Sequence, residues 1–389
     1  MKRLKVLFIS SWFPTKEQPV GGVFVRELAK AVALHEDVVV LHCAGPESNL
    51  HKFWCMQKEM DETVTSGIST YRVWHRRLMA KKISYVVYIW SVFKAFRQMV
   101  SENFRPHIIH AHSYDAGLPS ILIGKLYRIP VIVTEHSTAF PRKLLKHSSP
   151  HIAKLVFENI KVAITVSKSL QRAIEEYGIR ANFQVIPNAV DTDLFNPGSF
   201  PKSENHLKRL LFVGLLHLSH KKGIPCLLNA LAMVREHRDD WLLEIVGDGP
   251  ARAEYERMAV DLGLVDKVTF HGLKSKEEVA EFMRQADIFV LPSIFETFAV
   301  VAAEALATGL PVLATRCGGP EDFITDDVGM LIPPGNVSAL CSGLDYMLNH
   351  LETFSSEHIS SYARKRFSTQ TVGERLHRLY MDCLTYNKN

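Results

Sequence analysis

The chain has 389 residues, of which 47% are hydrophobic and 22% charged. This composition is typical of a globular protein and excludes a disordered, fibrous or repeat-built chain. The length exceeds that of one compact domain and indicates two or three. The six cysteines form neither a CxxC pair nor a cluster with zinc spacing, which is the cysteine usage of a reducing compartment.

The formal net charge of +5 is unevenly distributed along the chain. Residues 1–195 contain 26 Lys and Arg against 16 Asp and Glu, whereas the remainder contains 20 against 25. A basic first half and an acidic second half indicate different partners for each half. No stretch reaches the roughly 20 apolar residues of a membrane-spanning helix, and the apolar run Val6–Ile9 is too short for a signal peptide. We therefore expect a cytoplasmic protein that contacts at most the inner face of a membrane.

Short apolar strands alternate with helical patterns through the first half. A strand at 4–9 precedes a loop that contains Gly21 and Gly22 and a helix at 24–34. Further strands are expected at 38–42, 108–110 and 131–134. This alternation predicts βαβ units in a parallel sheet.

The same rhythm restarts in the second half. Strands are expected at 210–213, 242–246, 268–270, 288–291 and 311–314, and helices at 224–235, 252–262, 276–285 and about 298–308. Between the halves, the Pro-, Gly- and Ser-containing segment from Asn196 to Asn205 predicts a linker. We therefore expect an α/β protein of two doubly wound domains facing a central cleft, residues 1–195 and 196–366, with a helix at 367–389 returning to the first domain. Ligands bind at the carboxyl ends of the strands in such sheets.

The segment Leu291–Thr315 carries the strongest functional pattern. Glu296 lies near the tip of the helix expected to begin at Phe298, where unpaired backbone N–H groups attract anions. Glu304 follows after about 12 Å of helical rise and about 80° of rotation. The two carboxylates can therefore reach different ends of one elongated ligand, such as a nucleotide sugar. The alternative is a solvated helix, but the apolar residues around Glu304 favour a ligand.

This segment resembles the Glu-x7-Glu motif of glycosyltransferase family 4, the retaining enzymes of the GT-B fold. Four further segments carry the resemblance in the same order, over nearly the whole chain: Gly21-Gly22, Val185–Asp191, Phe212–Gly214 followed by Lys222-Gly223, and Val246–Pro250. The resemblance implies two Rossmann-like domains, with the acceptor in the first and the nucleotide-sugar donor in the second.

The resemblance also implies roles for individual residues. Glu304 would accept hydrogen bonds from the ribose, Glu296 would hold the donor sugar, and Lys222 would pair with the diphosphate. The predicted catalytic residues are His112, Glu296 and Lys222. The predicted donor-binding residues are Gly21, Gly22, Gly214, Lys221, Lys222, Leu273, Glu296, Thr297, Phe298, Ala299 and Glu304. The predicted acceptor-binding residues are His136, Tyr114 and Arg142.

The sequence departs from the family pattern at two positions. Leu215 stands where the family has an arginine after the glycine of the diphosphate loop, and Lys221 is a candidate to replace that charge. Ala299 stands where a glycine is common. Both departures concern the placement of the donor and leave the expected class of reaction unchanged.

No metal or other cofactor is expected beside the nucleotide sugar. His110 and His112 are expected to lie on different faces of the strand if it continues, and no Asp-x-Asp motif accompanies them. Lysine and helix-tip N–H groups would replace a metal at the diphosphate. His110 is interpreted as a structural residue.

The stretch 72–105 contains eight Lys and Arg against one acid, Glu102, and its part from 83 to 100 is rich in aromatic residues. Three interpretations stay open: a helix in peripheral contact with an anionic membrane, a core helix with a solvated basic edge, or a wall of the acceptor site. Nucleic acid is not expected, because no binding motif accompanies the charge.

The expected function is transfer of a hexose or N-acetylhexosamine from a UDP-sugar, for example UDP-GlcNAc, to a hydroxyl acceptor with retention of configuration. The acceptor would be either a lipid-linked saccharide of surface polysaccharide or glycolipid biosynthesis, or a secondary metabolite such as an aminoglycoside antibiotic. A GT-B nucleotide-sugar epimerase and a non-catalytic nucleotide-sugar-binding protein are the alternatives. A nicotinamide dehydrogenase is disfavoured, because no GxGxxG follows the first strand.

Overall fold

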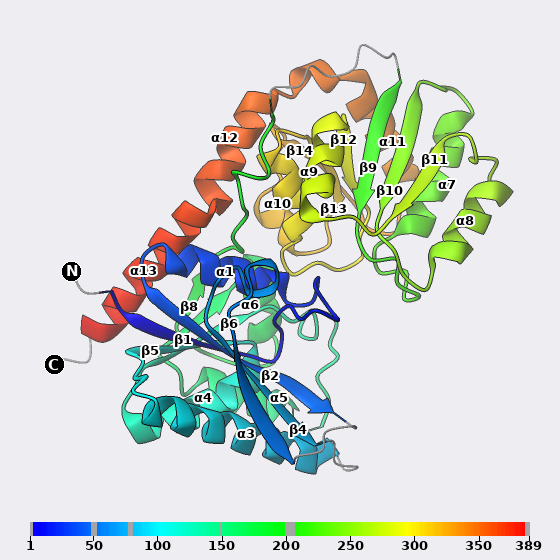
Figure 1. Cartoon of the computed structure of the whole chain (residues 1–389). Helices are drawn as coiled ribbons and strands as arrows, with labels where there is room; N and C mark the ends of the chain where they lie inside the picture. Colours follow the sequence, from blue (N-terminus) through cyan, green and yellow to red (C-terminus); the bar gives the residue numbers. More distant parts are fainter. Residues whose placement is uncertain (1–2, 48–52, 77–80, 148, 199–206, 386–389) are drawn as a thin grey trace. The chain divides into compact units, whose positions relative to one another are not determined.

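The computed structural model describes residues 3–47, 53–76, 81–147, 149–198 and 207–385. The chain divides into two compact units. Unit 1 comprises Met1–Ala189 and Thr369–Asn389, and unit 2 comprises Val190–Ser368. Each unit contains a mostly or wholly parallel sheet with helices against its faces (Figure 1), which is the expected α/β architecture.

The sheet of unit 1 has the strand order β3-β4-β2-β1-β5-β6-β7-β8 in the described residues, and only β3 and β4 pair antiparallel to each other. Its strands are β1 (Lys5–Ser10), β2 (Asp37–Glu47), β3 (Trp54–Glu59), β4 (Thr70–Arg76), β5 (Ile108–His112), β6 (Val131–Glu135), β7 (Val162–Thr165) and β8 (Phe183–Val185). Its helices are α1 (Val23–Ala33), α2 (Glu62–Thr65), α3 (Lys81–Ser101), α4 (Tyr114–Tyr127), α5 (Ser149–Phe157), α6 (Lys168–Glu175) and α13 (Thr369–Thr385). The central strands β5, β6 and β7 are buried along their whole length, as apolar runs covered on both faces require.

Unit 2 contains a parallel sheet of order β11-β10-β9-β12-β13-β14 in the described residues. Its strands are β9 (Lys208–Val213), β10 (Trp241–Val246), β11 (Val268–Gly272), β12 (Ile288–Leu291), β13 (Val312–Thr315) and β14 (Gly329–Ile332). Its helices are α7 (Ile224–Arg235), α8 (Arg252–Asp261), α9 (Lys276–Gln285), α10 (Val300–Ala307), α11 (Val337–Asn349) and α12 (Ser356–Phe367), with 3₁₀ turns η1 (Gly319–Asp322) and η2 (Leu351–Thr353).

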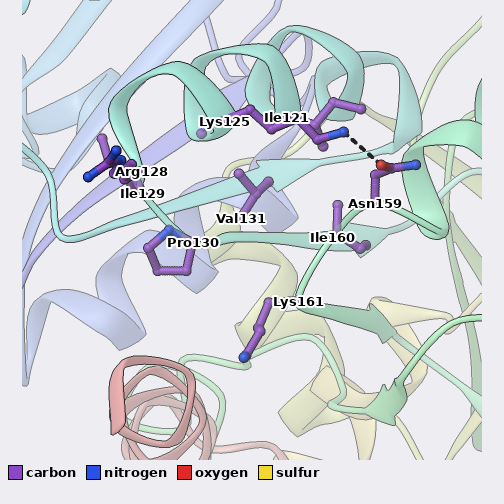
Figure 2. A pocket seen from close by; sticks show the side chains of 10 residues that line it. Ile121, Lys125, Arg128, Ile129, Pro130, Val131, Asn159, Ile160 and Lys161 are labelled. Carbon is purple, nitrogen blue, oxygen red and sulfur yellow. Dashed lines mark hydrogen bonds between the residues drawn. The ribbon is translucent and has the colours of Figure 1, made fainter. Parts of the chain in front are cut away.

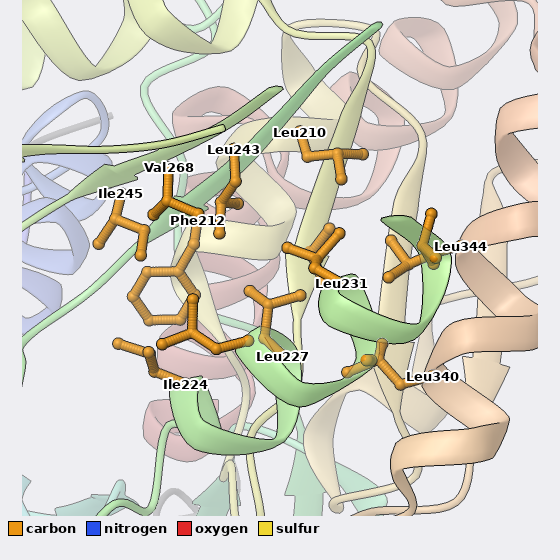
Figure 3. Packing of buried hydrophobic residues seen from close by; sticks show 14 of the residues in the cluster. Leu210, Phe212, Ile224, Leu227, Leu231, Leu243, Ile245, Val268, Leu340 and Leu344 are labelled. Carbon is orange, nitrogen blue, oxygen red and sulfur yellow. The ribbon is translucent and has the colours of Figure 1, made fainter. Parts of the chain in front are cut away.

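Helical spacing builds the core on one side of this sheet. Ile224, Leu227 and Leu231 recur on one face of α7, and Figure 3 shows them pointing toward the strands. Phe212 of β9 and Leu243 of β10 meet them there, and all five side chains are fully buried. This packing fixes α7, and with it the loop between β9 and α7.

The chain crosses between the units at other positions than the sequence indicated. The expected boundary followed residue 195, whereas the structure assigns Val190 onward to unit 2. Bonds to other residues of unit 2 accompany this earlier boundary: the N–H of Val190 donates to the carbonyl of Phe367 at 2.8 Å, and the guanidinium of Arg284 donates to the carbonyls of Leu194 (2.7 Å) and Asn196 (3.2 Å). Most of the predicted linker, 199–205, lies outside the described residues.

The helix expected at 367–389 is α13, Thr369–Thr385 in the described residues, and it belongs to unit 1 as expected. Phe367 is instead the last residue of α12 in unit 2, and Ser368 separates the two helices. His377 of α13 pairs through Nδ1 with Glu36 at 2.5 Å, and the hydroxyl of Tyr380 lies 2.7 Å from Nδ1 of His110. α13 is therefore tied to the sheet of unit 1 through buried polar groups.

The basic, aromatic stretch at 72–105 forms the end of β4 and helix α3. One side of α3 is core, since Val92, Ala95, Phe96 and Met99 are fully buried. The other side exposes Ile83, Val86 and Trp90. Within the described residues, no helix combines the length and apolarity needed to cross a bilayer. α3 is a core helix with an exposed edge, and the membrane contact stays a prediction.

Apart from the antiparallel edge strand β3, each sheet in the described residues reverses its strand order at one point. The reversal lies between β1 and β5 in unit 1 and between β9 and β12 in unit 2. Doubly wound sheets bind ligands at the carboxyl ends of the strands that flank such a point. The residues that follow Ser10, His112, Val213 and Leu291 are therefore the first candidates for a functional site.

Candidate functional site

An ion pair lies at the reversal point of unit 2. Lys222, in the loop after β9, donates from Nζ to Oε1 of Glu296, in the loop after β12, at 2.7 Å. Ser293 donates to the same oxygen at 2.8 Å. The side chains of Lys222 and Glu296 are 23% and 12% exposed. The structure thus brings together two residues predicted to be catalytic, and Ser293 is a partner that the sequence did not reveal.

Backbone contacts hold the two loops against each other. The N–H of Ile294 donates to the carbonyl of Lys221 at 2.8 Å. Gly223 has a φ of 73°, and a Cβ added there would lie 1.8 Å from the carbonyl oxygen of Pro292. Only glycine permits both this conformation and this approach. The position of Lys222 therefore depends on its neighbour, Gly223.

The helix that follows Glu296 begins without a side-chain cap. Its N-cap, Ala299, has a φ of 70° and makes no side-chain cap, so the first N–H groups of α10 resemble an anion site. The backbone of Glu296 pairs with Cys317 and Gly319, each at 2.9 Å. These bonds fix the approach of Thr297 and Phe298 to the helix. Ala299 adopts the left-handed conformation for which glycine is better suited.

Three further residues predicted to bind the donor lie on separate elements of unit 2. Glu304 lies on α10 and is partly exposed, whereas its neighbours Ala303 and Ala305 are fully buried. Leu273 follows β11 and is 63% exposed. Gly214 follows β9, with its N–H bonded to the carbonyl of Val246 at 3.0 Å. The donor roles of Glu304, Leu273 and Gly214 rest on the family pattern and stay predictions.

Three histidine rings form a stack in unit 1. The rings of His110 and His112 are 4.6 Å apart, and those of His112 and His136 are 5.5 Å apart. Nδ1 of His112 lies 3.2 Å from Nε2 of His136, so one ring donates and the other accepts. His110 bonds Tyr380 and Thr134 at 2.7 and 2.6 Å. Both ring nitrogens of His110 thus have a hydrogen-bond partner within the protein, which agrees with the structural role expected for this residue.

The expectation that His110 and His112 lie on different faces was wrong. β5 continues through His112, and residues two apart in a strand share a face. Among the described residues, no group of three or more His, Cys, Asp or Glu is arranged so that it could hold a metal ion, and the absence of a metal stays a prediction.

Burial sets the charge of these histidines. It lowers the pKa of His110 and of His136 to about 3, and it lowers that of His112 well below the usual value, with the neighbouring imidazoles adding to the effect. All three rings are therefore neutral at physiological pH. Nε2 of His112 and Nδ1 of His136 have no hydrogen-bond partner within the described part of the chain. Buried polar atoms without partners are uncommon and indicate a missing ligand or water.

Glu135 is a buried carboxyl group whose importance the sequence did not indicate. It accepts hydrogen bonds from the N–H groups of Tyr114 (2.9 Å), His136 (2.9 Å) and Ser137 (2.8 Å). Burial raises its pKa to about 7 against the effect of these bonds. Glu135 therefore joins two predicted acceptor residues, Tyr114 and His136. Arg142, the third, is partly exposed on a turn, and its role stays a prediction.

Of the two glycines after β1, Gly22 has a local structural cause in addition to the expected approach of a ligand. Gly22 has a φ of 69°, and a Cβ there would lie 2.5 Å from the carbonyl carbon of Trp12. The packing of the chain against itself is therefore sufficient reason for Gly22. At Gly21 the atom nearest to an added Cβ would be the carbonyl oxygen of Gln18, at 3.5 Å, which is an ordinary contact. The approach of a ligand therefore remains the one proposed reason for a glycine at this position.

A pocket of about 850 Å³ lies beside these glycines at the carboxyl ends of β1 and β2. The residues that line it are Ser11, Trp12, Phe13, Thr15, Glu17, Gln18, Val20, Gly21, Gly22, Phe24, His42, Ala44 and Trp74. Of these, only Gly21 and Gly22 were predicted from the sequence. The signal available in the sequence was a large aromatic residue, Trp12, two positions after an apolar strand; in the structure this residue is 57% exposed.

A second pocket of unit 1, about 380 Å³ in volume, lies at the opposite edge of the sheet, where β6 and β7 begin (Figure 2). Lys125, Arg128 and Lys161 contribute to its lining, and Lys125 donates to Oδ1 of Asn159 at 2.8 Å. No residue predicted for a site lines this pocket.

Comparison with known families agrees with this division of the chain. The family model described as Glycosyl transferases group 1 matches residues 198–366, and the model described as Glycosyltransferase Family 4 matches residues 21–194. The D-inositol 3-phosphate glycosyltransferase of Corynebacterium jeikeium is 30% identical in an alignment 306 residues long that covers 70% of this chain and 71% of that relative. The alpha-monoglucosyldiacylglycerol synthase of Streptococcus pneumoniae is 26% identical, over 74% of this chain and 69% of its own.

Solved structures share the fold. The sucrose-phosphate synthase of Thermosynechococcus elongatus matches 99% of this chain and 100% of its own, with a TM-score of 0.76 at 19% identity. Anabaena HepE, solved in complex with UDP and glucose, matches 97% of this chain and 100% of its own, with a TM-score of 0.73 at 18% identity. The chain therefore belongs to glycosyltransferase family 4 and is a glycosyltransferase of the GT-B fold.

Proposed function

We propose that this glycosyltransferase moves a hexose or N-acetylhexosamine from a UDP-sugar to a hydroxyl group, with retention of configuration. The observation that carries the proposal is the Lys222–Glu296 pair, 2.7 Å long, at the reversal point of the sheet of unit 2 and beside the N-terminus of α10. A cation beside a helix N-terminus that lacks a side-chain cap suits a diphosphate. The adjacent carboxylate suits sugar hydroxyls.

The proposed reaction breaks the bond from the anomeric carbon to the phosphate oxygen and forms a bond to the acceptor oxygen. The acceptor's proton passes to the departing phosphate on the same face of the sugar. Lys222 and the first N–H groups of α10 stabilise the negative charge that develops on this phosphate. Glu296 holds the sugar and Glu304 the ribose. In this proposal no metal is needed, because Lys222 supplies the cation.

Unit 1 is proposed to bind the acceptor. His112 and His136 are neutral and each has a buried ring nitrogen without a partner in the described structure. Such atoms can donate to or accept from a hydroxyl group without an accompanying charge. We propose that His112 serves the reacting sugar, and that His136 and Tyr114, linked through Glu135, serve the acceptor.

The exposed edge of α3 supports a proposed contact with the inner face of the cytoplasmic membrane. Ile83, Val86 and Trp90 are 53%, 63% and 42% exposed, and Lys94 and Arg97 are exposed on the same helix. Apolar and basic groups together favour anionic lipid. A lipid-linked saccharide acceptor would be reached from that position.

The test is an incubation of the full chain with UDP-glucose, UDP-galactose and UDP-GlcNAc, each with and without mixed saccharide acceptors, followed by mass analysis. Transfer with one donor is expected. An isomerised UDP-sugar without acceptor would identify an epimerase, and binding of UDP without turnover would identify a binding protein. Either result would refute the proposal.

The variant Glu304→Gln keeps the shape of the side chain and removes its charge. We expect the KM for the donor to rise at least tenfold, because a hydrogen bond from ribose to a charged acceptor contributes about 1.5–3 kcal/mol. An unchanged KM in the folded variant would contradict the ribose role.

A further inference from the structure

The loop between β9 and α7 contains a tight turn shortly before Lys222. The N–H of His220 donates to the carbonyl of His217 at 3.0 Å, which closes the turn, and the N–H of Gly223 donates to the carbonyl of His220 at 2.9 Å. His220 has a φ of 48°. A residue with a Cβ adopts this left-handed conformation at a cost, and it persists where the surrounding structure holds it. His220 is therefore a fixed point of the loop, two residues before Lys222.

A buried tyrosine of α8 contacts both ends of this turn. The hydroxyl of Tyr255 lies 2.9 Å from Nδ1 of His220 and 3.3 Å from the carbonyl oxygen of His217. The rings of Tyr255 and His220 meet edge to face, with their centres 5.7 Å apart. Tyr255 is packed in the hydrophobic core of unit 2. The turn is thus attached to a rigid part of the unit.

The contacts of Tyr255 indicate which group donates to which. Burial, with Glu254 adding to it, raises the pKa of Tyr255, so the hydroxyl keeps its single proton. A carbonyl can only accept, so both bonds form together when Tyr255 donates to His217 and accepts from the Nδ1–H of His220. The carbonyl of His217 would by itself satisfy the buried hydroxyl. The bond to His220 is therefore not required by the burial of Tyr255, and its effect falls on the loop.

Two contacts of this loop flank Lys222 in the sequence. Before it, His220 is bonded to Tyr255, and after it, Gly223 packs against the loop that follows β12. The chain has Leu215 where the family pattern has an arginine, so a diphosphate meets no charge from that position. Binding of the diphosphate then depends more strongly on where the ammonium of Lys222 is held.

We propose that His220 is a positioning residue of the donor site: through its bond to Tyr255 it fixes the loop so that Lys222 meets the second phosphate of a nucleoside diphosphate. The inference rests on the proposed function, since it assumes that Lys222 pairs with the diphosphate. A charge on a loop free to move loses much of its interaction, because the pair must then be ordered on binding. Without the bond, the second phosphate is held more weakly, whereas the nucleoside and the first phosphate are unaffected.

The experiment compares four single variants of the full chain with the wild type. Tyr255→Phe removes only the hydroxyl, and His220→Ala removes the imidazole. His220→Asn keeps an N–H near the position of Nδ1 and tolerates the left-handed conformation. Glu254→Gln is the matched control, because it removes the exposed acid 3.7 Å from Nε2 of His220 and leaves the bond between Nδ1 and Tyr255 in place. Thermal unfolding shows that each variant is folded.

Calorimetry gives the dissociation constants of UDP and UMP, with the pairs ADP and AMP, and GDP and GMP, measured alongside. The ratio of the monophosphate constant to the diphosphate constant reports the contribution of the second phosphate alone. We expect this ratio to fall at least fivefold in Tyr255→Phe and in His220→Ala, while the constant for UMP stays within twofold of the wild type. The ratio should recover to within twofold in His220→Asn and stay unchanged in Glu254→Gln. A double variant, Tyr255→Phe with His220→Ala, should lose no more than His220→Ala alone, because the two removed groups form one bond.

Equal weakening of UMP and UDP, an unchanged ratio in Tyr255→Phe and His220→Ala, or losses that multiply in the double variant would overturn the inference. A wild type that prefers no diphosphate to its monophosphate would also overturn it. Tyr255→Phe and His220→Ala each test the bond, so a loss of folding in one leaves the other decisive. If the expected losses are found with ADP or GDP in place of UDP, or without any transfer of sugar, the proposed function fails and the assignment of His220 stands.

Discussion

Replacing Gly223 by alanine tests whether the loop after β9 must pass as close to Pro292 as the structure places it. The added methyl would lie 1.8 Å from a backbone carbonyl oxygen, which cannot rotate away as a side chain would. Gly263, in the same unit, offers a matched control. Its φ is 68° against 73° for Gly223, but a Cβ there meets nothing within 4 Å.

The control separates two costs that the test variant combines. A left-handed alanine costs about 1–2 kcal/mol, and the stiffer unfolded chain returns about 0.4–1 kcal/mol. Gly263→Ala should therefore lower the free energy of unfolding by about 1 kcal/mol. Gly223→Ala adds the overlap with Pro292, which costs about 1–3 kcal/mol, so its total loss should be about 2–4 kcal/mol. In a unit of this size each kcal/mol lowers Tm by about 2–4 °C.

The assay combines thermal unfolding with sugar transfer. Gly223→Ala should lower Tm by about 10 °C, and should reduce kcat more than 100-fold at a temperature where the variant is folded, because the loop also carries Lys222. Gly263→Ala should transfer sugar at the wild-type rate. Equal Tm values for the two variants, or wild-type turnover in Gly223→Ala, would refute the close approach and the placement of Lys222 derived from it.

Two further predictions concern charge. Lys222→Met should reduce kcat by about 100- to 1,000-fold, which is the effect of removing one donor to a developing anion. The control variant Arg235→Ala breaks the exposed ion pair between Arg235 of α7 and Asp266 and should leave kcat unchanged. Similar rates for Lys222→Met and the wild type would show that Lys222 does not belong to the site. The buried histidines should make the fold sensitive to acid. The pKa of His136 is about 3 in the folded chain, against an ordinary value of 6.5, so between these values only the unfolded chain binds the proton. The free energy of unfolding should therefore fall as the pH drops below 6.5. His136 alone should reduce the free energy of unfolding by about 2 kcal/mol between pH 8 and pH 5. In urea unfolding, the variant His136→Gln should therefore show a pH dependence of this free energy that is smaller by that amount. An identical pH dependence in variant and wild type would contradict the burial of His136 as a neutral ring.

The sequence predicted best those elements that are long, periodic and clearly terminated. The helices at 224–235 and 276–285 have the expected bounds. In the first, a glycine and a proline mark the start, and in the second, Ser275 and Glu278 form a capping box. Signals of this kind act between residues that are close in sequence and do not depend on the rest of the fold. A single sequence is therefore sufficient to recognise them.

The features that the sequence did not reveal depend on contacts between distant segments. The segment that follows the boundary after Ala189 is held by distant residues of unit 2, since Val190 bonds Phe367 and Arg284 bonds Leu194 and Asn196. The pocket with Trp12 requires β1, β2 and β4 to lie side by side. Neither a propensity nor a periodicity records such pairings. The error about His110 and His112 was of another kind, because the two-residue period of a strand was available and was misapplied.

The Lys222–Glu296 pair changes what the family motif alone implied about the donor. The motif assigned the two residues separate tasks, one at the diphosphate and one at the sugar. In the structure they share a hydrogen bond of 2.7 Å, and Ser293 bonds the same carboxylate oxygen at 2.8 Å. A diphosphate that takes Lys222 must therefore compete with Glu296 or share the ammonium with it. If it is shared, the two side chains act as one unit, and a double variant, Lys222→Met with Glu296→Gln, should lose little more activity than either single variant. Losses that multiply would instead show two independent contacts, as the motif alone implied.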